Sequence, residues 1–501
     1  MALLLKNAHV IDPQVGLNET ADILVRDGKI VEIGQNLAME KGVERDLGGK
    51  IVVPGLVDIH VHLREPGYEL KEDIASGTRA AAHGGFTAVC CMPNTKPVID
   101  NAVGVEYVKA RAAAVGKCRV HVAGSCSQGL KGDTLSEMGD MVAHGAVAFT
   151  DDGRGVQGAG MMRRVMDYAA QFDRVVMSHC QDEDLVGAGQ VNEGVVSTRL
   201  GMLGWPAEGE EIQIARDIAI CRLTGCPLHI QHLTTARGLD LVRAAKAEGL
   251  PVTCEVTPHH LFLTEDAIGD DYNTFLKVNP PLRTAEDAAA LVEGVKDGTV
   301  DAIVTDHAPH NDFEKNAEFE LAPFGMIGLE TALSLVITNL VAPGVISWER
   351  AVELMAVRPR KILRVERVAL EPGAAADLTV IDPEAAWTVD AGLPVQGREL
   401  GLPRRRADRS RHRRLRGRLR HHGGRRHRRV GSSPARSSNH AAPHRANDAG
   451  PFCAMPGAPD GHTGRKKRSD EPTRRRRSPA AVPDARFFLR CCVAGVEEGR
   501  S

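Results

Sequence analysis

The feature that most constrains the fold of this chain is a repeated alternation between short apolar runs and longer segments with helical periodicity. Eight apolar runs, of the kind that form buried parallel strands, follow one another between about residues 51 and 305. Helix-like segments lie between most of them, for example at 70–85, 160–172, 208–223 and 236–249. This pattern predicts an α/β fold with a closed (β/α)8 barrel of the TIM type, and an open doubly wound sheet is the alternative.

Polar side chains gather at the predicted strand ends, where a barrel of this kind carries its chemistry. The first run, residues 51–57, leads into His60-Val61-His62, and alternation along a strand points both imidazoles the same way. Later runs end at four more candidate ligands, which are Asp152, His179, His232 and Asp306. Imidazole and carboxylate groups suit Zn²⁺, and six of them favour two metal ions over one.

Each of these residues also has an ordinary structural role when it is taken alone. Buried histidines that merely pack are common, and most aspartates that precede a glycine, as Asp152 does, belong to turns. We expect His229 to point to the other face of its strand, and His259 and His260 to pack or to bond locally. The joint placement of the six candidates is what indicates a metal site.

Both ends of the apolar part of the chain predict one small β domain. Residues 2–34 hold short alternating runs around an Asp27-Gly28 turn, and a second β-like piece lies at 376–389. Neither piece could bury its face alone. We therefore expect a small β-sandwich built from residues 1–50 and 364–392, with the barrel at 51–363 between them.

Charge and cysteine content bear on the class of protein and on its compartment. Residues 401–501 hold 27 Lys and Arg against 8 Asp and Glu, whereas the residues before them hold 36 against 57. The acidic body is typical of a globular enzyme rather than of a nucleic-acid binder. Eleven cysteines without a Cys-x-x-Cys spacing, and no uninterrupted apolar stretch near 18 residues, predict a cytoplasmic protein that does not enter membranes.

Seven segments carry a resemblance to a known family. They are HVHLREPG (60–67), CCMPNTKP (90–97), AFTDDG (148–153), MSHCQD (177–182), HIQHLTT (229–235), KVNPPLR (277–283) and TDHAPHNDFEK (305–315). With this array, residues 1 to about 392 resemble the dihydroorotases of the amidohydrolase superfamily, in their long bacterial type I form. Many superfamily members bridge two metals with a carbamylated lysine after strand 4, where this chain has Phe149-Thr150-Asp151-Asp152, as the type I family does.

The resemblance implies a role for each matched residue. The metal ligands for one or two Zn²⁺ would be His60, His62, Asp152, His179, His232 and Asp306. The substrate would be bound by His62, Arg64, Asn94, Asn279 and His310 and by the backbone at Phe324 and Gly325. Arg64 offers a planar two-donor fork that fits a carboxylate.

The implied activity is the reversible cyclisation of N-carbamoyl-L-aspartate to L-dihydroorotate in pyrimidine (UMP) biosynthesis. Metal-bound hydroxide would attack the ring carbonyl, and Asp306 would act as general acid and base. The alternatives are another cyclic amidohydrolase of the hydantoinase or allantoinase kind, and a non-catalytic dihydroorotase-like subunit of aspartate transcarbamoylase. The partners expected are the small-molecule substrate, a second copy of the chain, and aspartate transcarbamoylase, but not nucleic acid.

Two segments outside the ligand set also carry predictions. We expect Asn311–Gly325, which directly follows the eighth strand, to form a mobile lid over the substrate. We expect residues 393–501 to form a disordered basic tail. We interpret this tail as a frameshift product, because GRELGL at 397–402 is codon-compatible, one base out of register, with a family-like Ala-Gly-Asn-Ser-Ala-Phe.

Overall fold

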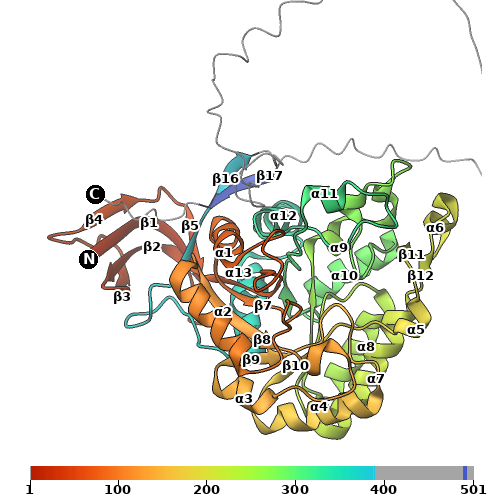
Figure 1. Cartoon of the computed structure of the whole chain (residues 1–501). Helices are drawn as coiled ribbons and strands as arrows, with labels where there is room; N and C mark the ends of the chain where they lie inside the picture. The colour runs from red at the N-terminus through yellow and green to blue at the C-terminus, as the bar shows by residue number, and fades with distance from the viewer. Residues whose placement is uncertain (1, 388, 390–488, 494–501) are drawn as a thin grey trace, which may run out of the picture. The chain divides into compact units, whose positions relative to one another are not determined.

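Eight parallel strands form the predicted barrel in the computed structural model, which describes residues 2–387, 389 and 489–493 (Figure 1). The strands are β6 (Leu56–Val61), β7 (Phe86–Cys91), β8 (Arg119–Gly124), β9 (Ala146–Phe149), β10 (Val175–Ser178), β13 (Leu228–Ile230), β14 (Val252–Val256) and β15 (Ala302–Ile303). Each pairs with the next along the chain. The ring closes through a parallel bridge between Val61 and His307, whose carbonyl accepts a 2.8 Å hydrogen bond from the backbone of His62.

Helices follow most of the strands and pack around the barrel (Figure 1). The longer ones are α1 (Ile74–His83), α2 (Ala102–Val115), α4 (Ala159–Gln171), α7 (Glu208–Thr224), α8 (Ala236–Ala247) and α10 (Ala285–Asp297). Shorter ones are α3 (Met138–Ala143), α5 (Glu183–Val186), α6 (Val195–Leu200), α9 (Pro258–Phe262), α11 (Asp312–Lys315), α12 (Ala332–Val336), α13 (Trp348–Val352) and α14 (Arg358–Leu363). The four helices predicted from periodicity are confirmed as α1, α4, α7 and α8.

Local sequence explains where these helices begin and which face they bury. α1 starts after Asp73, whose side chain accepts a hydrogen bond from the Ser76 amide, and Thr235 caps α8 in the same way at Gly238. In α4 the buried residues are Met161, Met162, Val165, Met166 and Ala169. This spacing of three and four places them on one stripe against the barrel.

Alternation along the strands separates the interior of the barrel from its outer surface. Small and apolar side chains such as Val57, Ile59, Ala88 and Ala148 fill the interior, and Leu363 of α14 packs with them. The alternate positions pack against the helices. Most polar side chains of the interior therefore lie at the carboxyl ends of the strands, and His229 and Thr253 are polar residues below that level.

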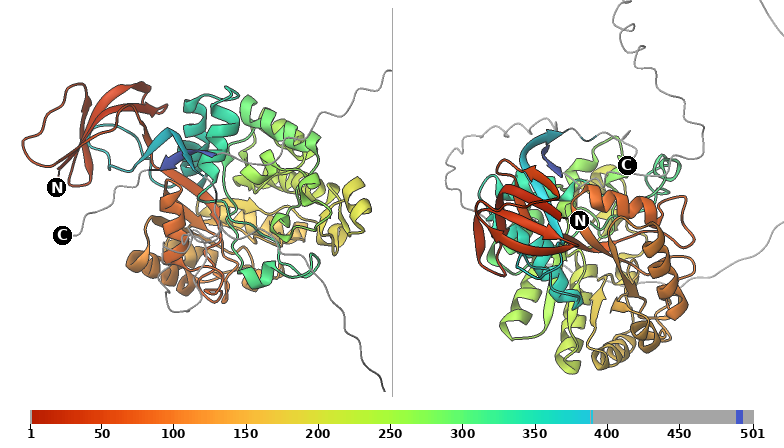
Figure 2. Two further views of the ribbon diagram at one scale, coloured as in Figure 1. Left: turned by 90° about the horizontal axis from the view of Figure 1, so that it is seen from above. Right: turned by 90° about the vertical axis from the view of Figure 1, so that its left-hand side faces the viewer.

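Strands from both predicted segments form the small domain, together with two strands that lie outside those segments (Figure 2). They are β1 (Ala2–Asp12), β2 (Leu17–Arg26), β3 (Lys29–Gly34), β4 (Val43–Asp46), β5 (Ile51–Pro54), β16 (Leu378–Trp387) and β17 (Leu489–Val493). All seven belong to one hydrogen-bonded sheet, in the order β17-β16-β5-β1-β2-β3 with β4 also on β1, where a sandwich was predicted. The predicted turn at Asp27-Gly28 joins β2 to β3, and both residues have positive φ.

The apolar run at 51–57, which we predicted as one strand, is shared between the two sheets. β5 pairs with β1 and β16 of the small sheet, whereas β6 begins the barrel after Gly55. A Cβ on Gly55 would lie 2.1 Å from Asp377 Oδ1 and 2.2 Å from Thr87 Oγ1, so only glycine fits where the chain crosses between sheets. The small sheet therefore extends past residue 50, where we had placed its end.

The predictions for residues 393–501 fall outside the described residues, except where β17 pairs antiparallel with β16. Among the helices that are described, none combines the length and the apolar character needed to cross a membrane.

Candidate metal centre

Asp152 lies at the centre of the six side chains predicted as metal ligands. Its Oδ1 lies 3.3 Å from His60 Nε2, 3.5 Å from His179 Nδ1 and 3.8 Å from His232 Nε2. Its Oδ2 lies 3.4 Å from His62 Nε2. A single carboxylate thus faces all four histidines, which come from three different strand ends.

Asp306 joins the group from the end of β15. Its Oδ1 lies 3.0 Å from His62 Nε2 and 3.6 Å from His60 Nε2. Ligand atoms in a tetrahedral zinc site lie roughly 3.3 Å apart, because bonds of about 2.05 Å meet at the tetrahedral angle. The observed spacings of 3.0 to 3.8 Å match that value.

In three of the four histidines, one ring nitrogen makes a hydrogen bond on the side that faces away from the cluster. The other ring nitrogen therefore points toward the centre of the cluster. His60 Nδ1 lies 2.5 Å from Glu255 Oε1, and His62 Nδ1 lies 2.9 Å from the Asn94 side-chain oxygen. Both outer partners are acceptors, so each Nδ1 carries a hydrogen and each Nε2 points inward, where it can offer a lone pair to a metal ion in place of a proton.

His179 is oriented in the opposite sense. Its Nε2 donates to Gln181 Oε1 at 3.0 Å, so its Nδ1 faces inward, 2.8 Å from His232 Nε2. Among the described residues, His60 Nε2 and Asp152 Oδ1 are buried and have no hydrogen-bond partner. Inward lone pairs, two carboxylates and unpartnered atoms form a site that requires cations, so the donor set fits bound divalent metal.

The electrostatics of the cluster agree with this interpretation. Burial alone would lower the pKa of His60, but Glu255, Asp152 and Asp306 raise it well above its usual value. For Asp306 the effects have the opposite sign: burial alone would raise its pKa, but the neighbouring His60 and the hydrogen bond from His62 lower it. The carboxylates therefore stay ionised, and a proton held by His60 occupies a position where a metal ion could bind instead.

Three residues at this site have backbone conformations that L side chains rarely adopt. The φ angles are 61° at Arg64, 30° at His232 and 45° at Asp306. Such conformations cost about 1–3 kcal/mol each and persist where the surrounding structure enforces them. Their concentration at predicted ligand and substrate positions is typical of a functional site.

The predicted substrate residues line one cavity above the ligands. Its volume is about 360 Å³, and its wall includes Arg64, Asn94, Asn279, His310, Phe324 and Gly325 together with His62, Asp152, His179, His232 and Asp306. Of the predicted set, His60 alone is absent from this wall, and it is fully buried. A cavity of this size suits a small molecule.

Two of the predicted substrate residues also bond to the ligand cluster. Asn94 accepts from His62, and its Nδ2 donates to Asp152 Oδ2 at 3.1 Å. Asn279 Nδ2 donates to Gln181 Oε1 at 2.8 Å, while its Oδ1 is buried and has no partner within the described part of the chain. Asn94 thus orients two of the candidate ligands, whereas Asn279 offers an unused acceptor.

Arg64 and His310 form another part of the cavity wall. The Arg64 Nε donates to the Pro309 carbonyl at 3.2 Å, and its Nη2 lies 3.4 Å from His310 Nε2. Burial, together with the charges of Arg64 and Lys71, lowers the pKa of His310 to about 2. His310 is therefore a neutral imidazole beside a guanidinium that retains donors for an anion.

The segment predicted as a lid, Asn311–Gly325, forms one side of this cavity through its last residues. Two buried lysines hold it: Lys277 donates to the carbonyls of Phe319 and Glu320, and Lys315 donates to those of Pro323 and Gly325. The segment is thus anchored at its carboxyl-terminal half, and its mobility stays a prediction.

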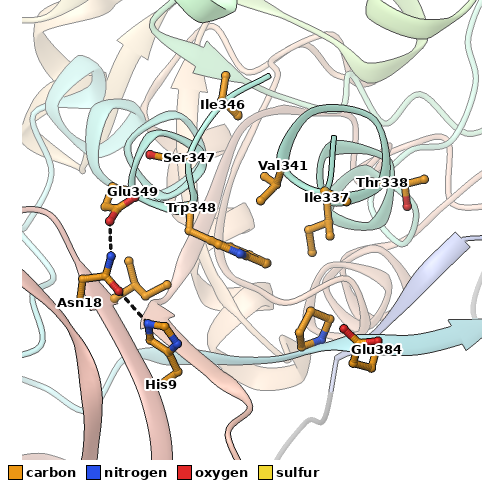
Figure 3. Close-up of a pocket in the computed structure, with 13 residues that line it drawn as sticks. His9, Asn18, Ile337, Thr338, Val341, Ile346, Ser347, Trp348, Glu349 and Glu384 are labelled. Carbon is orange, nitrogen blue, oxygen red and sulfur yellow. Dashed lines mark hydrogen bonds between the residues drawn. The ribbon is translucent and has the colours of Figure 1, made fainter. Parts of the chain in front are cut away.

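A second cavity, of about 700 Å³, lies between the small sheet and the barrel (Figure 3). Its wall is largely apolar, with Trp348, Val341 and Ile337, and Asn18 bridges His9 and Glu349 at one end. None of the residues in its wall belongs to the possible metal-binding groups, which all lie at the strand ends. The larger cavity is therefore not the candidate active site.

The structure corrects the prediction for His229 and adds residues that the sequence analysis missed. His229 points into the barrel, where its Nε2 bonds to Glu255 Oε2 at 3.0 Å. His260 packs as expected, bonded to Thr257 and to the Pro280 carbonyl.

Two residues that support the site, Glu255 and Gln181, were not predicted from the sequence. The signal for Glu255 was a carboxylate inside the apolar run of β14, and the signal for Gln181 was a polar side chain two residues after His179.

Comparison with known proteins gives consistent matches. A family model described as "Dihydro-orotase-like" matches residues 49–237. A curated protein named dihydroorotase from Pelotomaculum thermopropionicum is 50% identical over 412 residues, covering 80% of this chain and 96% of that protein. One of the same name from Geobacter metallireducens is 51% identical over 392 residues, covering 78% and 92%.

Solved structures with the same fold include two hydantoinases. The L-hydantoinase (dihydropyrimidinase) from Arthrobacter aurescens has a TM-score of 0.70 and 28% identity, covering 78% of this chain and 88% of that one. The D-hydantoinase (dihydropyrimidinase) from a Thermus species has a TM-score of 0.67 and 26% identity, covering 77% and 88%. Both support the barrel with its separate sheet.

Proposed function

The chain belongs to the dihydroorotase family of cyclic amidohydrolases, and on that premise we propose how its strand-end centre interconverts N-carbamoyl-L-aspartate and L-dihydroorotate. The observation that carries the proposal is the convergence of four histidines and two carboxylates beneath a cavity walled by Arg64. So many inward-facing donor atoms would be left without partners if the site did not bind metal ions.

We assign the ligands to two zinc positions. His60, His62 and Asp306 would hold one ion, His179 and His232 the other, and Asp152 would lie between them, since its two oxygens face both sets. When bound, the ions would supply Lewis acidity, which polarises the reacting carbonyl and makes water nucleophilic at neutral pH.

Asp306 would carry the proton. In hydrolysis, water attacks the ring amide carbonyl, Asp306 accepts the proton released, and the ring C–N bond breaks as that proton passes to nitrogen. Ring closure runs the same relay backward. The low pKa of Asp306 keeps it ionised and able to accept, and the side chain opens onto the cavity.

The carboxylate that does not react would bind to Arg64. Its Nη2 faces the cavity beside the neutral His310, while its Nε is fixed by Pro309. The unpaired Oδ1 of Asn279 would accept a ring N–H, and the residues at 324 and 325 would contact the ring through their backbone. These groups orient the substrate and exclude water without taking part in bond making.

A hydantoinase-like activity is the nearest alternative, since the solved structures with this fold include hydantoinases. Arg64 argues against it, because a hydantoin or dihydropyrimidine ring without a carboxylate leaves this half-buried guanidinium without an anion. A non-catalytic subunit is disfavoured because every ligand predicted for the centre is present.

The test is an assay of the purified chain, with metal analysis, on L-dihydroorotate, on 5,6-dihydrouracil and on hydantoin. We expect one to two zinc ions per chain, hydrolysis of dihydroorotate, and turnover of the other two at least about a hundredfold lower. Asp306→Asn should lower kcat by about 10²–10⁴. Metal-loaded protein that hydrolyses hydantoin but not dihydroorotate would overturn the proposal.

Three further expectations stay predictions. They are a cytoplasmic location, a homodimer, and a complex with aspartate transcarbamoylase.

A further inference from the structure

Lys71 joins three parts of the cavity rim. Its Nζ lies 3.1 Å from His310 Nδ1 and 2.9 Å from Glu314 Oε1, and it lies over the ring of Tyr68. Lys71 belongs to the turn after Arg64, and Glu314 belongs to α11 in the segment that follows β15. Nothing in the assigned chemistry uses this ammonium, although it touches a wall residue of the cavity.

The contact with Lys71 decides where His310 carries its hydrogen. An ammonium group can only donate, so Nδ1 of His310 must accept and the ring hydrogen must be on Nε2. The other side of the ring agrees, because Nε2 lies 2.8 Å from the Phe324 carbonyl, which can only accept. Two independent partners thus select the same tautomer of a ring whose lowered pKa keeps it neutral.

The opposite tautomer, with the hydrogen on Nδ1, would also find hydrogen-bond partners. In that tautomer His310 would accept from Arg64 and use one of the Arg64 donors. With the hydrogen on Nδ1, His310 could donate to Glu314 Oε2, which lies 3.7 Å away. The lone pair left on Nε2 would then accept from Arg64 Nη2 at 3.4 Å and occupy a donor that faces the cavity. The two tautomers therefore correspond to two networks: in one, His310 Nε2–H donates to the Phe324 carbonyl and Arg64 Nη2 stays free to donate, whereas in the other His310 Nε2 accepts from that same Arg64 donor.

We propose that Lys71 is a positioning residue for carboxylate binding: it holds His310 in the Nε2–H tautomer, which cannot accept from Arg64 at Nε2, so that Arg64 Nη2 stays available to donate to the substrate's non-reacting carboxylate. This inference deepens the proposed function and rests on it for the identity of the anion. Through Glu314 the same ammonium links His310 and Arg64 to the segment after β15.

The direct test is ¹⁵N NMR of the zinc-loaded chain labelled at histidine, with His310→Asn used to assign the signals. The ¹⁵N shifts separate protonated from unprotonated ring nitrogens. We expect Nε2–H in the parent chain and in Lys71→Arg, which also can only donate. Lys71→Met should shift the equilibrium to Nδ1–H. Lys71→Met/Glu314→Gln, which lacks the charged acceptor for that hydrogen, should return it part of the way.

Kinetics give the second readout. Lys71→Met should raise KM for dihydroorotate about tenfold or more with a smaller change in kcat, whereas Lys131→Met, which replaces an exposed lysine away from the cavity, should change neither. An unchanged His310 tautomer in Lys71→Met would overturn the inference. The NMR result does not depend on turnover, so a tautomer shift in a chain that fails to hydrolyse dihydroorotate would refute the proposed function and leave the role of Lys71 standing.

Discussion

The Nδ1 atom of His60 lies 2.5 Å from Oε1 of Glu255, so a fully buried carboxylate on β14 fixes a proposed ligand histidine on β6. The other oxygen of Glu255 bonds to His229, whose Nδ1 lies 2.8 Å from Thr253 Oγ1. A carboxylate behind a ligand histidine sets its tautomer and raises its basicity. The chain from Thr253 to His60 thus extends the metal centre into the barrel.

Replacement of that carboxylate should weaken metal binding. Glu255→Gln removes the charge that favours a cation at His60, and we expect zinc affinity to fall about 10–100-fold, measured by competition with a chelator. Thr253→Val is the matched control, because it alters the far end of the same network without touching a ligand, and it should change affinity less than about threefold. Equal losses in both variants would mean that packing, and not the carboxylate, supports the site.

Metal binding should release a proton at neutral pH. In the metal-free chain the pKa of His60 is raised above its usual value of 6.5, so at pH 7 the ring is protonated and the metal must displace that proton. Zinc affinity should therefore rise as pH rises, by up to about tenfold per pH unit below the pKa of His60. Calorimetry in buffers of different ionisation enthalpy measures the proton count; a pH-independent affinity without proton release would contradict this.

Much of the fold and of the ligand set could be predicted because each rests on local pattern. Alternation fixes the direction of His60 and His62 on one strand, and the apolar runs fix where the other ligands emerge. The division of the run at 51–57 could not be predicted, because the need for glycine at position 55 comes from Asp377 and Thr87, which are distant in sequence.

The supporting residues were missed for a similar reason. Glu255 contacts a residue 195 positions away and Lys71 one 239 positions away, so local sequence gives no sign of either contact. Gln181 contacts His179, only 2 positions away, and this contact could have been predicted. His229 was misplaced because β13 ends at Ile230, so alternation does not continue to His232, whose φ of 30° turns the chain. An alternating sequence pattern does not predict where the backbone will adopt a positive φ.

The basic segment after about residue 392 yields a prediction about the gene. The Geobacter metallireducens relative is covered over 92% of its length by 78% of this chain, so about a fifth of this chain has no counterpart there. If the segment arises from a frameshift, the neighbouring reading frame should encode a C-terminus similar to that of the relatives. Sequencing the gene tests this directly, and a neighbouring frame without such similarity would refute the frameshift.

Loss of the guanidinium should alter substrate preference more than catalysis. Arg64→Met removes the charged donor beside His310 while leaving His60, His62 and Asp306 in place. A charge-assisted pair contributes about 1.5–3 kcal/mol, so kcat/KM for L-dihydroorotate should fall roughly 10–150-fold, mainly through KM. 5,6-Dihydrouracil has the same ring without the carboxylate, and its slow hydrolysis should be unchanged or improved. If both substrates lost activity to the same extent, Arg64 would be supporting the site and not recognising the carboxylate.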